Sequence, residues 1–280
     1  MKLYLSLDME GMPGTFSWEH EKTDRSAVKR YFRAHVQNVL ETILSHPASA
    51  SLEEIRIADS HSAGDNLDYD ITALDPRISL ISGSPRPLYM MPALERGFDQ
   101  VWLLGYHAGT GALRGNMDHT YSNSRIHKIF INGQAMNEAL INAAYAGYMG
   151  VPVALVSGDT TLQAELQSKD SLPWIQYVPT KTAVAKFAAR SFSSLKVSEY
   201  VQTAVNKALV TPKAEIPLYR FDAPITLKIE FHSTAMTDQA CLMPHVKRLD
   251  GRVIEYSDSD YGVIFEAIMA LVTLASTANM

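Results

Sequence analysis

The sequence has almost no cysteine, no apolar stretch of membrane-spanning length and no glycine-rich nucleotide-binding motif. Cys241 is the single cysteine among 280 residues, so the chain cannot form an internal disulfide bond. This usage is typical of proteins from a reducing cytoplasm, and we expect a cytoplasmic protein. No continuously apolar segment approaches the roughly 20 residues that cross a bilayer, so we expect no membrane partner.

The signatures of several enzyme classes are also missing. The chain contains no Walker-type loop and no G-x-G-x-x-G fingerprint, so nothing indicates a nucleotide cofactor. A serine-histidine-aspartate triad has no support, because there is no G-x-S-x-G turn to carry the serine. The net charge of -5 and the lack of a long basic run argue against a nucleic-acid partner.

What the chain does contain is an ordinary share of apolar residues, 46%, in strands that alternate with helices. We predict strands at residues 2–7, 54–59, 78–81, 100–104, 126–132, 151–156, 175–178, 225–231 and 252–256. We predict helices at residues 25–46, 136–149, 161–167, 194–209 and 261–275. This order predicts an α/β fold with a mixed, largely parallel central sheet flanked by helices.

A run of prolines suggests how the chain is divided. Pro212, Pro217 and Pro224 mark a segment with the composition of a linker. We therefore expect a metal-binding catalytic portion over residues 1–211. A smaller C-terminal α/β portion over residues 212–280 packs on it, or the two form one continuous domain.

Two carboxylates stand directly after the first strand. Asp8 and Glu10 follow the apolar residues 2–7 and precede Gly11. Because side chains alternate along an extended backbone, Asp8 and Glu10 point to the same side. Two such carboxylates repel each other unless a positive charge lies between them, and a divalent metal ion is the usual partner. A strand end with two solvated acids is the simpler alternative at this point.

Further metal-binding residue types follow other strands. Asp59 and His61 come after the second strand, His107 follows the central strand, and Glu138 follows a strand and a turn. The carboxyl ends of parallel strands meet at one edge of a sheet, so these side chains can converge. Carboxylates and histidines together suit divalent ions of the zinc type. Five ligands exceed the needs of one tetrahedral ion, so we predict two ions bridged by Asp8, with the candidate ligands Asp8, Glu10, His61, His107 and Glu138.

Each of these residues also has an ordinary structural explanation. His61 could cap a turn, and Glu138 suits the first turn of a helix because of the helix dipole. His119 lies in the polar, glycine-rich loop over residues 109–124 and could simply be exposed there. Residue by residue these alternatives stay open, and only the combination favours a metal centre.

The ordered motifs of the chain resemble those of one enzyme family. They are Ser6-Leu7-Asp8-Met9-Glu10-Gly11, Asp59-Ser60-His61-Ser62, Gly105-Tyr106-His107-Ala108, Met117-Asp118-His119-Thr120 and Ile131-Asn132-Gly133 with Glu138 beyond it. These motifs, and nearly the whole chain, are similar to the zinc-dependent D-aminopeptidases of the DppA type, peptidase family M55. The chain departs from the family pattern at Gly109, where an arginine is common, and this departure concerns substrate specificity more than metal binding.

The resemblance implies a binuclear zinc peptidase that acts on short peptides with an N-terminal D-amino acid such as D-Ala. It implies one zinc ion held by Asp8, Glu10 and His61, and a second held by Asp8, His107 and Glu138. It implies that His119 is the catalytic histidine and that the protein is a ring-like homo-oligomer, a decamer. Mn²⁺ or Co²⁺ would suit the same mixture of ligands as Zn²⁺.

A site of this kind would hydrolyse a peptide bond with metal-activated water. Two zinc ions lower the pKa of bound water toward neutrality and stabilise the oxyanion that forms. His119 would move protons, because an imidazole titrates near neutral pH. The same ligands would serve a metal-dependent amidase or another hydrolase with a non-peptide substrate. A non-catalytic protein that binds a metal ion or peptides is a more distant alternative.

Overall fold

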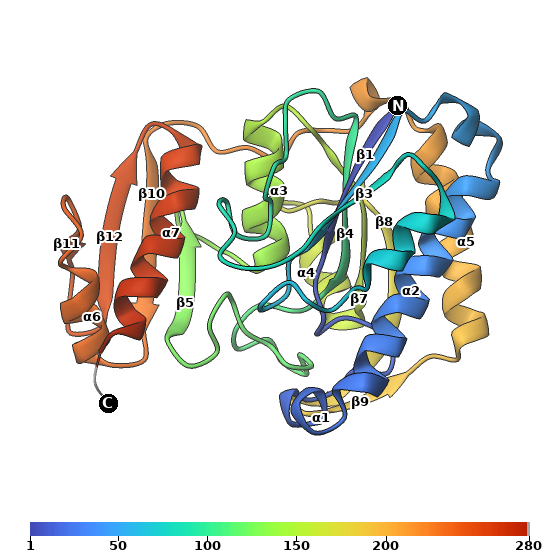
Figure 1. Ribbon diagram of the computed structural model, residues 1–280. Helices are drawn as coiled ribbons and strands as arrows, with labels where there is room; N and C mark the ends of the chain where they lie inside the picture. The colour runs from blue at the N-terminus through green and yellow to red at the C-terminus, as the bar shows by residue number, and fades with distance from the viewer. Residues whose placement is uncertain (279–280) are drawn as a thin grey trace.

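Two β-sheets organise the chain in the computed structural model, which describes residues 1–278 (Figure 1). The first sheet has the strand order β3-β2-β1-β4-β7-β8-β9. All its neighbouring strands are parallel except β8 and β9, which form an antiparallel pair. Its strands are β1 (Lys2–Leu7), β2 (Glu54–Asp59), β3 (Ile78–Ile81), β4 (Gln100–Tyr106), β7 (Val153–Asp159), β8 (Gln176–Ala185) and β9 (Ala188–Ser191).

The central strands of this sheet end at the same edge. β1 lies between β2 and β4, and Leu7 pairs with Asp59 on one side and with Leu104 on the other. These strands are apolar and mostly buried, as expected of a parallel sheet that is covered on both faces. The residues that follow β1, β2 and β4 therefore meet at the lower edge of the sheet in Figure 1.

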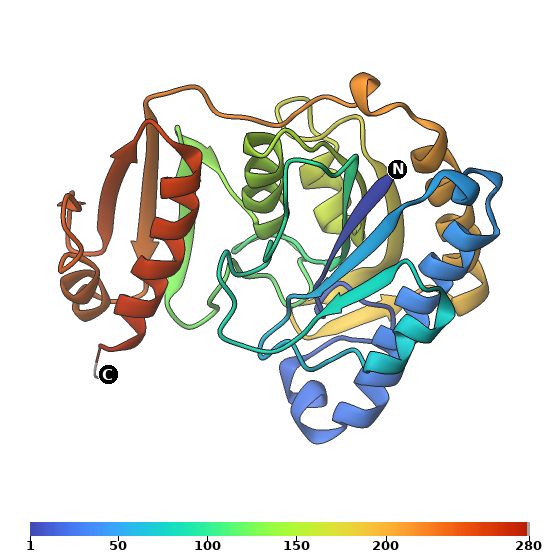
Figure 2. The ribbon, with the colours of Figure 1, turned by 45° about the horizontal axis from the view of Figure 1, so that its top comes forward.

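One face of the first sheet is covered by α2 (Arg25–Ser45) and α5 (Ser194–Val210) (Figures 1 and 2). The apolar sides of both helices pack on Leu3, Leu5 and Leu7 and their neighbours in the sheet. The Asp24 side chain accepts a hydrogen bond from the backbone N–H of Ala27 (3.2 Å) and so caps the start of α2.

The other face is covered by α3 (Glu138–Tyr148), with α4 (Thr160–Leu166) at the end of β7. The Asn137 side chain accepts a hydrogen bond from the backbone N–H of Leu140 (2.8 Å), which starts α3 at Glu138. The residues of α3 up to Gly147 are buried, because the helix lies between the first sheet and the second half of the structure (Figure 1).

The second sheet is antiparallel and has the strand order β11-β12-β10-β5-β6. The helix α7 (Tyr261–Ser276) packs against both α3 and this sheet, and α6 (Thr234–Ala240) packs beside it. One apolar core runs from the first sheet through α3 to the second sheet. The strands are β5 (Ile126–Ile131), β6 (Gln134–Ala135), β10 (Ile225–Phe231), β11 (Lys247–Arg248) and β12 (Val253–Asp258).

The structure confirms the predicted fold class, a mixed and largely parallel sheet flanked by helices. It differs from the predictions at element ends: β8 continues to Ala185, because its second half pairs with β9 as a hairpin. No helix within residues 1–278 has both the length and the hydropathy to cross a membrane. The division at residue 212 stays a prediction. The sequence patterns did not indicate α1 (Trp18–Thr23), α6, β6, β9, β11 or the 3₁₀ helices η1 (Pro47–Ser51), η2 (Tyr69–Leu74) and η3 (Lys213–Glu215).

A buried histidine connects α2 to the first sheet. His35 lies on the buried side of α2, and its Nε2 is 3.0 Å from the Ser157 Oγ at the end of β7. The same Ser157 oxygen accepts a hydrogen bond from the backbone N–H of Gly105 (2.9 Å). Burial lowers the pKa of His35 from its ordinary value of 6.5 to about 4, so the folded protein keeps this imidazole neutral.

We expect His35 to make the protein sensitive to acid. Below pH 6.5 the unfolded chain binds a proton at His35 that the folded chain does not take up until about pH 4, so stability falls as the pH falls through this window. For this one group, the loss between pH 7 and pH 5 is about 2 kcal/mol. Urea unfolding at both pH values should show that His35→Gln, which cannot titrate, loses less stability than the wild type by about this amount. An equal loss in both proteins would contradict the assignment.

Candidate metal centre

The turn after β1 is hydrogen-bonded to the end of β4 and packs closely against it. The backbone N–H of Asp8 donates to the Leu104 carbonyl oxygen (2.8 Å), and that of Gly11 donates to the Gly105 carbonyl oxygen (2.7 Å). A Cβ atom at Gly11 would lie 1.8 Å from the Tyr106 carbonyl oxygen, so only glycine fits. This close approach places Asp8 and Glu10 beside the residues that follow β4.

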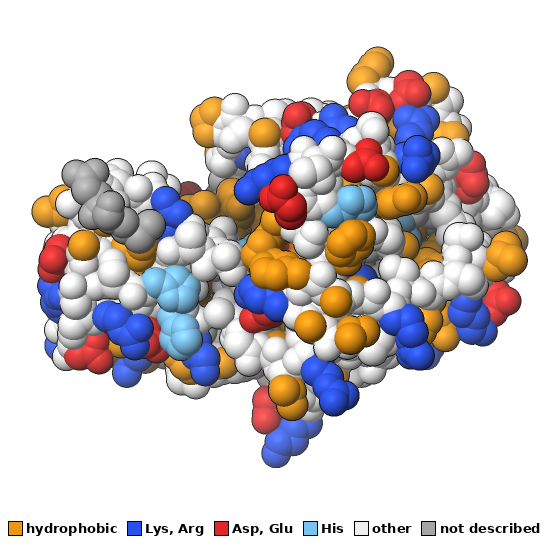
Figure 3. Space-filling model, turned by 90° about the horizontal axis from the view of Figure 1, so that it is seen from below, with side chains coloured by type: hydrophobic (Ala, Val, Ile, Leu, Met, Phe, Trp, Pro, Cys, Tyr) orange, Lys and Arg blue, Asp and Glu red, His pale blue; other side chains and the backbone are white. Residues whose placement is uncertain are grey.

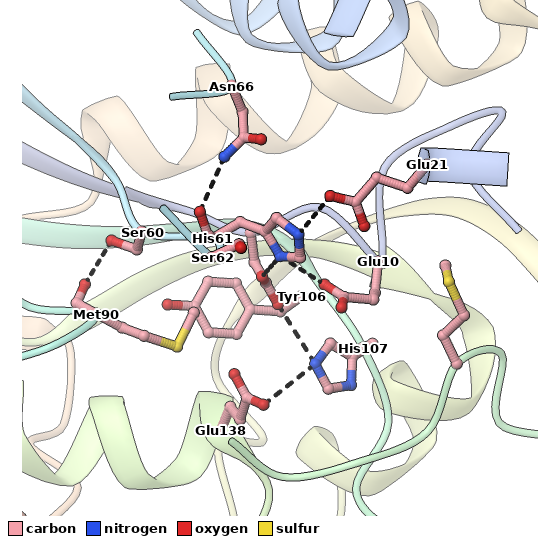
Figure 4. Close-up of polar contacts among 12 residues, drawn as sticks. Glu10, Glu21, Ser60, His61, Ser62, Asn66, Met90, Tyr106, His107 and Glu138 are labelled. Atoms are coloured by element: carbon pink, nitrogen blue, oxygen red, sulfur yellow. Dashed lines mark hydrogen bonds and ion pairs between the residues drawn. The ribbon is translucent and has the colours of Figure 1, made fainter. Parts of the chain in front are cut away.

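Asp8, Glu10 and His61 form a first buried group that could hold a metal ion. The His61 Nδ1 lies 3.2 Å from the Asp8 Oδ1 and 3.1 Å from the Glu10 Oε2 (Figure 4). Asp59 is not part of this group. Its carboxylate accepts hydrogen bonds from the backbone N–H groups of Asn66 (2.6 Å) and Leu67 (2.9 Å), and it thereby stabilises the loop that follows His61.

His107, His119 and Glu138 form a second group of this kind. The His107 Nε2 lies 3.4 Å from the Asp8 Oδ2 and 3.4 Å from the Glu138 Oε1 (Figure 4). The His119 Nε2 lies 3.5 Å from the same Glu138 oxygen, and the His107 and His119 rings stack with their centroids 4.2 Å apart. The structure thus brings all six predicted site residues together. It also places His119, which was predicted as a catalytic residue and not as a ligand, within ligand distance of His107 and Glu138.

The donor atoms of this centre fit a divalent cation. Asp8 Oδ2, Glu10 Oε2 and His107 Nε2 are buried and have no hydrogen-bond partner within residues 1–278. Burial and then the neighbouring Glu10 carboxylate raise the pKa of Asp8 to about 7, so the anionic form of Asp8 is disfavoured here. A cation between them would satisfy the unpartnered atoms and offset the repulsion.

The histidines respond to the same negative charge. Burial disfavours the protonated form of both His61 and His107. The facing carboxylates nevertheless raise the pKa of both imidazoles: Glu10 acts most strongly on His61, and Glu138 acts most strongly on His107, whose pKa rises to about 10. Burial and then the neighbouring His107 lower the pKa of His119. His119 is therefore the histidine of this centre that is held neutral.

Three residues at the centre were missed by sequence reasoning. Trp18 donates its indole N–H to the Glu10 Oε1 (2.8 Å), and the Glu21 Oε1 lies 3.0 Å from the His61 Nε2. Both belong to the six-residue helix α1, which is too short for a periodic pattern to reveal. Lys181 is fully buried, and its ammonium group donates to the backbone carbonyl oxygens of Glu10 and Thr15.

The two hydrogen bonds of the Lys181 ammonium group stabilise the segment between the first strand and α1. Burial lowers the pKa of Lys181 to about 7, while the charges of Asp159 and Glu10 oppose that change. The Thr180 hydroxyl donates to the Gly11 carbonyl oxygen (2.6 Å) next to it. Strand β8 therefore fixes the backbone on both sides of Gly11. A lone lysine and threonine in a polar stretch of sequence give no signal of this role.

Comparison with known proteins identifies the family. The model of the M55 peptidases, described as D-aminopeptidase, matches residues 1–270. The chain belongs to the M55 family. It is therefore an enzyme, a hydrolase of the D-aminopeptidase type. A D-aminopeptidase of Bacillus subtilis (strain 168) is 28% identical over 278 residues, which cover 98% of each chain.

A solved structure extends this similarity to the whole fold of the M55 chain. It is the Zn-dependent D-aminopeptidase DppA from Bacillus subtilis, described as a self-compartmentalizing protease. The match covers 100% of both chains with a TM-score of 0.91 and 25% sequence identity. Both sheets, and the edge that carries the two groups of ligand-type side chains, therefore belong to the fold that the M55 chain shares with this relative.

We expect a divalent cation to stabilise this M55 protein. A cation at a hundred times its dissociation constant raises the free energy of unfolding by about 3 kcal/mol, which scanning calorimetry should detect as a higher melting temperature that a chelator reverses. Asp8→Ala should abolish this shift, because Asp8 faces both groups, whereas the exposed Asp238→Ala should keep it. A full shift in Asp8→Ala would count against the centre.

Proposed function

We propose that this chain is a binuclear zinc aminopeptidase that hydrolyses short peptides with an N-terminal D-amino acid such as D-Ala. One observation carries the proposal: two groups of buried histidine and carboxylate side chains meet at Asp8, in a chain of the M55 family. The Bacillus subtilis relative of known structure is described as Zn-dependent, and histidine with carboxylate is a ligand mixture that zinc accepts. Mn²⁺ and Co²⁺ are the alternative ions for these ligands.

Asp8 is the proposed bridge between the two ions. Its Oδ1 faces His61, and its Oδ2 faces His107, so the two oxygens address different groups. Asp8, Glu10 and His61 would hold one ion, and Asp8, His107 and Glu138 the other. The unpartnered oxygens of Asp8 and Glu10 support this assignment.

The proposed catalytic role of His119 follows from its hydrogen bonding. Bound zinc ions would supply an activated water and a polarised carbonyl group. The His119 Nδ1 donates to the Met117 carbonyl oxygen (3.0 Å), which leaves the Nε2 as the atom that faces the centre. Because burial lowers the pKa of this imidazole, its Nε2 is free to accept a proton and to return it to the leaving amine. The Trp18 ring stands edge-on to the His119 ring, with the centroids 5.3 Å apart.

We also propose that the protein assembles with copies of itself, as a decamer, in the cytoplasm. The relative's description as a self-compartmentalizing protease supports an assembly. The lower face of the molecule exposes large apolar side chains, and Figure 3 shows hydrophobic side chains gathered near the middle of this face. Phe16, Leu113 and Phe187 are the large apolar residues exposed on the segments near the site. Contacts between copies would cover such a surface.

The proposed division of the chain places the catalytic chemistry in residues 1–211. All six site residues, from Asp8 to Glu138, lie in this portion. Residues 212–280 would then form the smaller α/β portion that packs on it. The support for this proposal is that β10, β12 and α7 lie together in the second half of the structure (Figure 1).

The test of the reaction combines metal content with activity. The purified protein should contain about two zinc ions per chain and should release D-alanine from D-alanyl peptides, and a chelator should abolish this release. L-alanyl peptides of the same length are the matched control and should be poorer substrates. Two ions without cleavage of any peptide would move the protein to another class of metal-dependent hydrolase, and no ions at all would refute the proposal.

Replacement of the proposed catalytic histidine separates chemistry from metal binding. His119→Ala should keep two ions per chain but lose at least a hundredfold in kcat, because general acid-base catalysis contributes roughly 10²–10⁴. Metal analysis and steady-state kinetics on one preparation would measure both. His127→Ala, on β5 outside the site, should leave both unchanged. Loss of one ion from His119→Ala would instead identify this residue as a ligand.

A further inference from the structure

The short helix α1 makes polar contacts with the candidate metal centre. It has six residues, and none of them is buried. A helix of this length is unstable alone, and its Trp18 ring is only partly buried, packed against Phe187. Two of its side chains, Trp18 and Glu21, also contact residues of the first ligand group.

Glu21 contacts the side of His61 that faces away from the other ligands. The His61 Nδ1 points to Asp8 and Glu10, and its Nε2 is 3.0 Å from the Glu21 Oε1 (Figure 4). If the Nδ1 binds a metal ion, the proton of the neutral imidazole must be on the Nε2. Glu21 is then the acceptor of that N–H. Its side chain is only 13% exposed, so water competes little for this bond.

Trp18 holds the carboxylate of Glu10 in position, as Glu21 holds the ring of His61. The indole N–H of Trp18 donates to the Glu10 Oε1 (2.8 Å). The other oxygen, Oε2, has no hydrogen-bond partner among the described residues 1–278 and is 3.1 Å from the His61 Nδ1. One oxygen of Glu10 is thus occupied by the indole, and the other is left for a cation.

We propose that α1 is an orienting element of the metal centre, in which Glu21 fixes the tautomer and ring position of His61 and Trp18 fixes the carboxylate of Glu10. This inference rests on the proposed zinc site, and it makes Glu21 and Trp18 positioning residues for one of the two ions. Within residues 1–278, α1 makes no hydrogen bond or ion pair with His107 or Glu138, the proposed ligands of the second ion, and it meets that group through the edge-on contact of the Trp18 ring with His119. Loss of α1 contacts therefore weakens one ion position selectively.

The expected effect is on zinc affinity. Removal of a hydrogen-bond partner of a metal-binding histidine typically weakens metal binding about 10- to 100-fold. Metal-free, full-length Glu21→Ala, titrated with zinc against a chromogenic chelator, should therefore show one ion bound as in the wild type and one bound at least tenfold more weakly. Glu19→Ala, an exposed position on the same helix, is the matched control and should bind both ions normally.

Conservative variants guard against a trivial loss of structure. Glu21→Gln keeps an acceptor oxygen of nearly the same shape and should restore part of the affinity. Trp18→Phe keeps an aromatic ring but removes the N–H, and it should also weaken the binding of one zinc ion. Trp174→Phe loses an indole hydrogen bond to the Val153 carbonyl oxygen. It is the matched control and should bind both ions as the wild type does.

A double variant tests whether Glu21 acts through His61. In a His61→Ala background, Glu21→Ala should cause no further loss of zinc affinity. An additional tenfold loss there would show that Glu21 acts independently of His61, and it would overturn the proposal. Wild type and Glu21→Ala with the same affinity for both ions would overturn it too, and would leave the proposed function intact. Wild-type protein that binds no zinc would overturn both.

Discussion

Repulsion among buried carboxylates is the constraint on which this structure depends. Asp8, Glu10 and Glu138 are buried at the edge of the first sheet, where charges are poorly screened. Asp8 shares His61 with Glu10 and His107 with Glu138. Each is opposed by a cationic or hydrogen-bonding group from another element: imidazoles after β2 and β4, an indole from α1 and the Lys181 ammonium near the Glu10 backbone. The elements around this edge are therefore arranged by electrostatics as much as by apolar packing.

The sequence was sufficient for the fold class, and it also pointed to the residues of the candidate centre, because both predictions follow from local patterns and one topological rule. Apolar runs and caps located the strands and the long helices, for example α2 after Asp24. Parallel strands carry the residues after their carboxyl ends to a common edge, which is why Asp8, His61 and His107 meet. His119 follows no strand, and only the resemblance to the M55 family indicated it.

The rest depends on interactions that no local pattern encodes. Strand β5 was predicted, but its partner β10 lies far along the chain, so its membership of a second sheet could not be predicted from either segment. The contacts of α1 come from a helix of less than two turns. Lys181 on β8 donates to the backbone carbonyl oxygen of Thr15, which lies far from it in the sequence. Such contacts appear only when the folded chain places distant segments together.

The composition of the second sheet also limits how the chain can be cut. Every proposed ligand precedes residue 212, yet β5, which leads into the turn and helix that carry Glu138, is completed by β10 from beyond that point. A fragment that ended before β10 would retain the proposed ligands and expose an unpaired strand edge, which is a template for aggregation. The C-terminal segment therefore cannot be removed or exchanged independently. Truncation of the chain at the proline-rich stretch would leave the remaining portion with an incomplete second sheet.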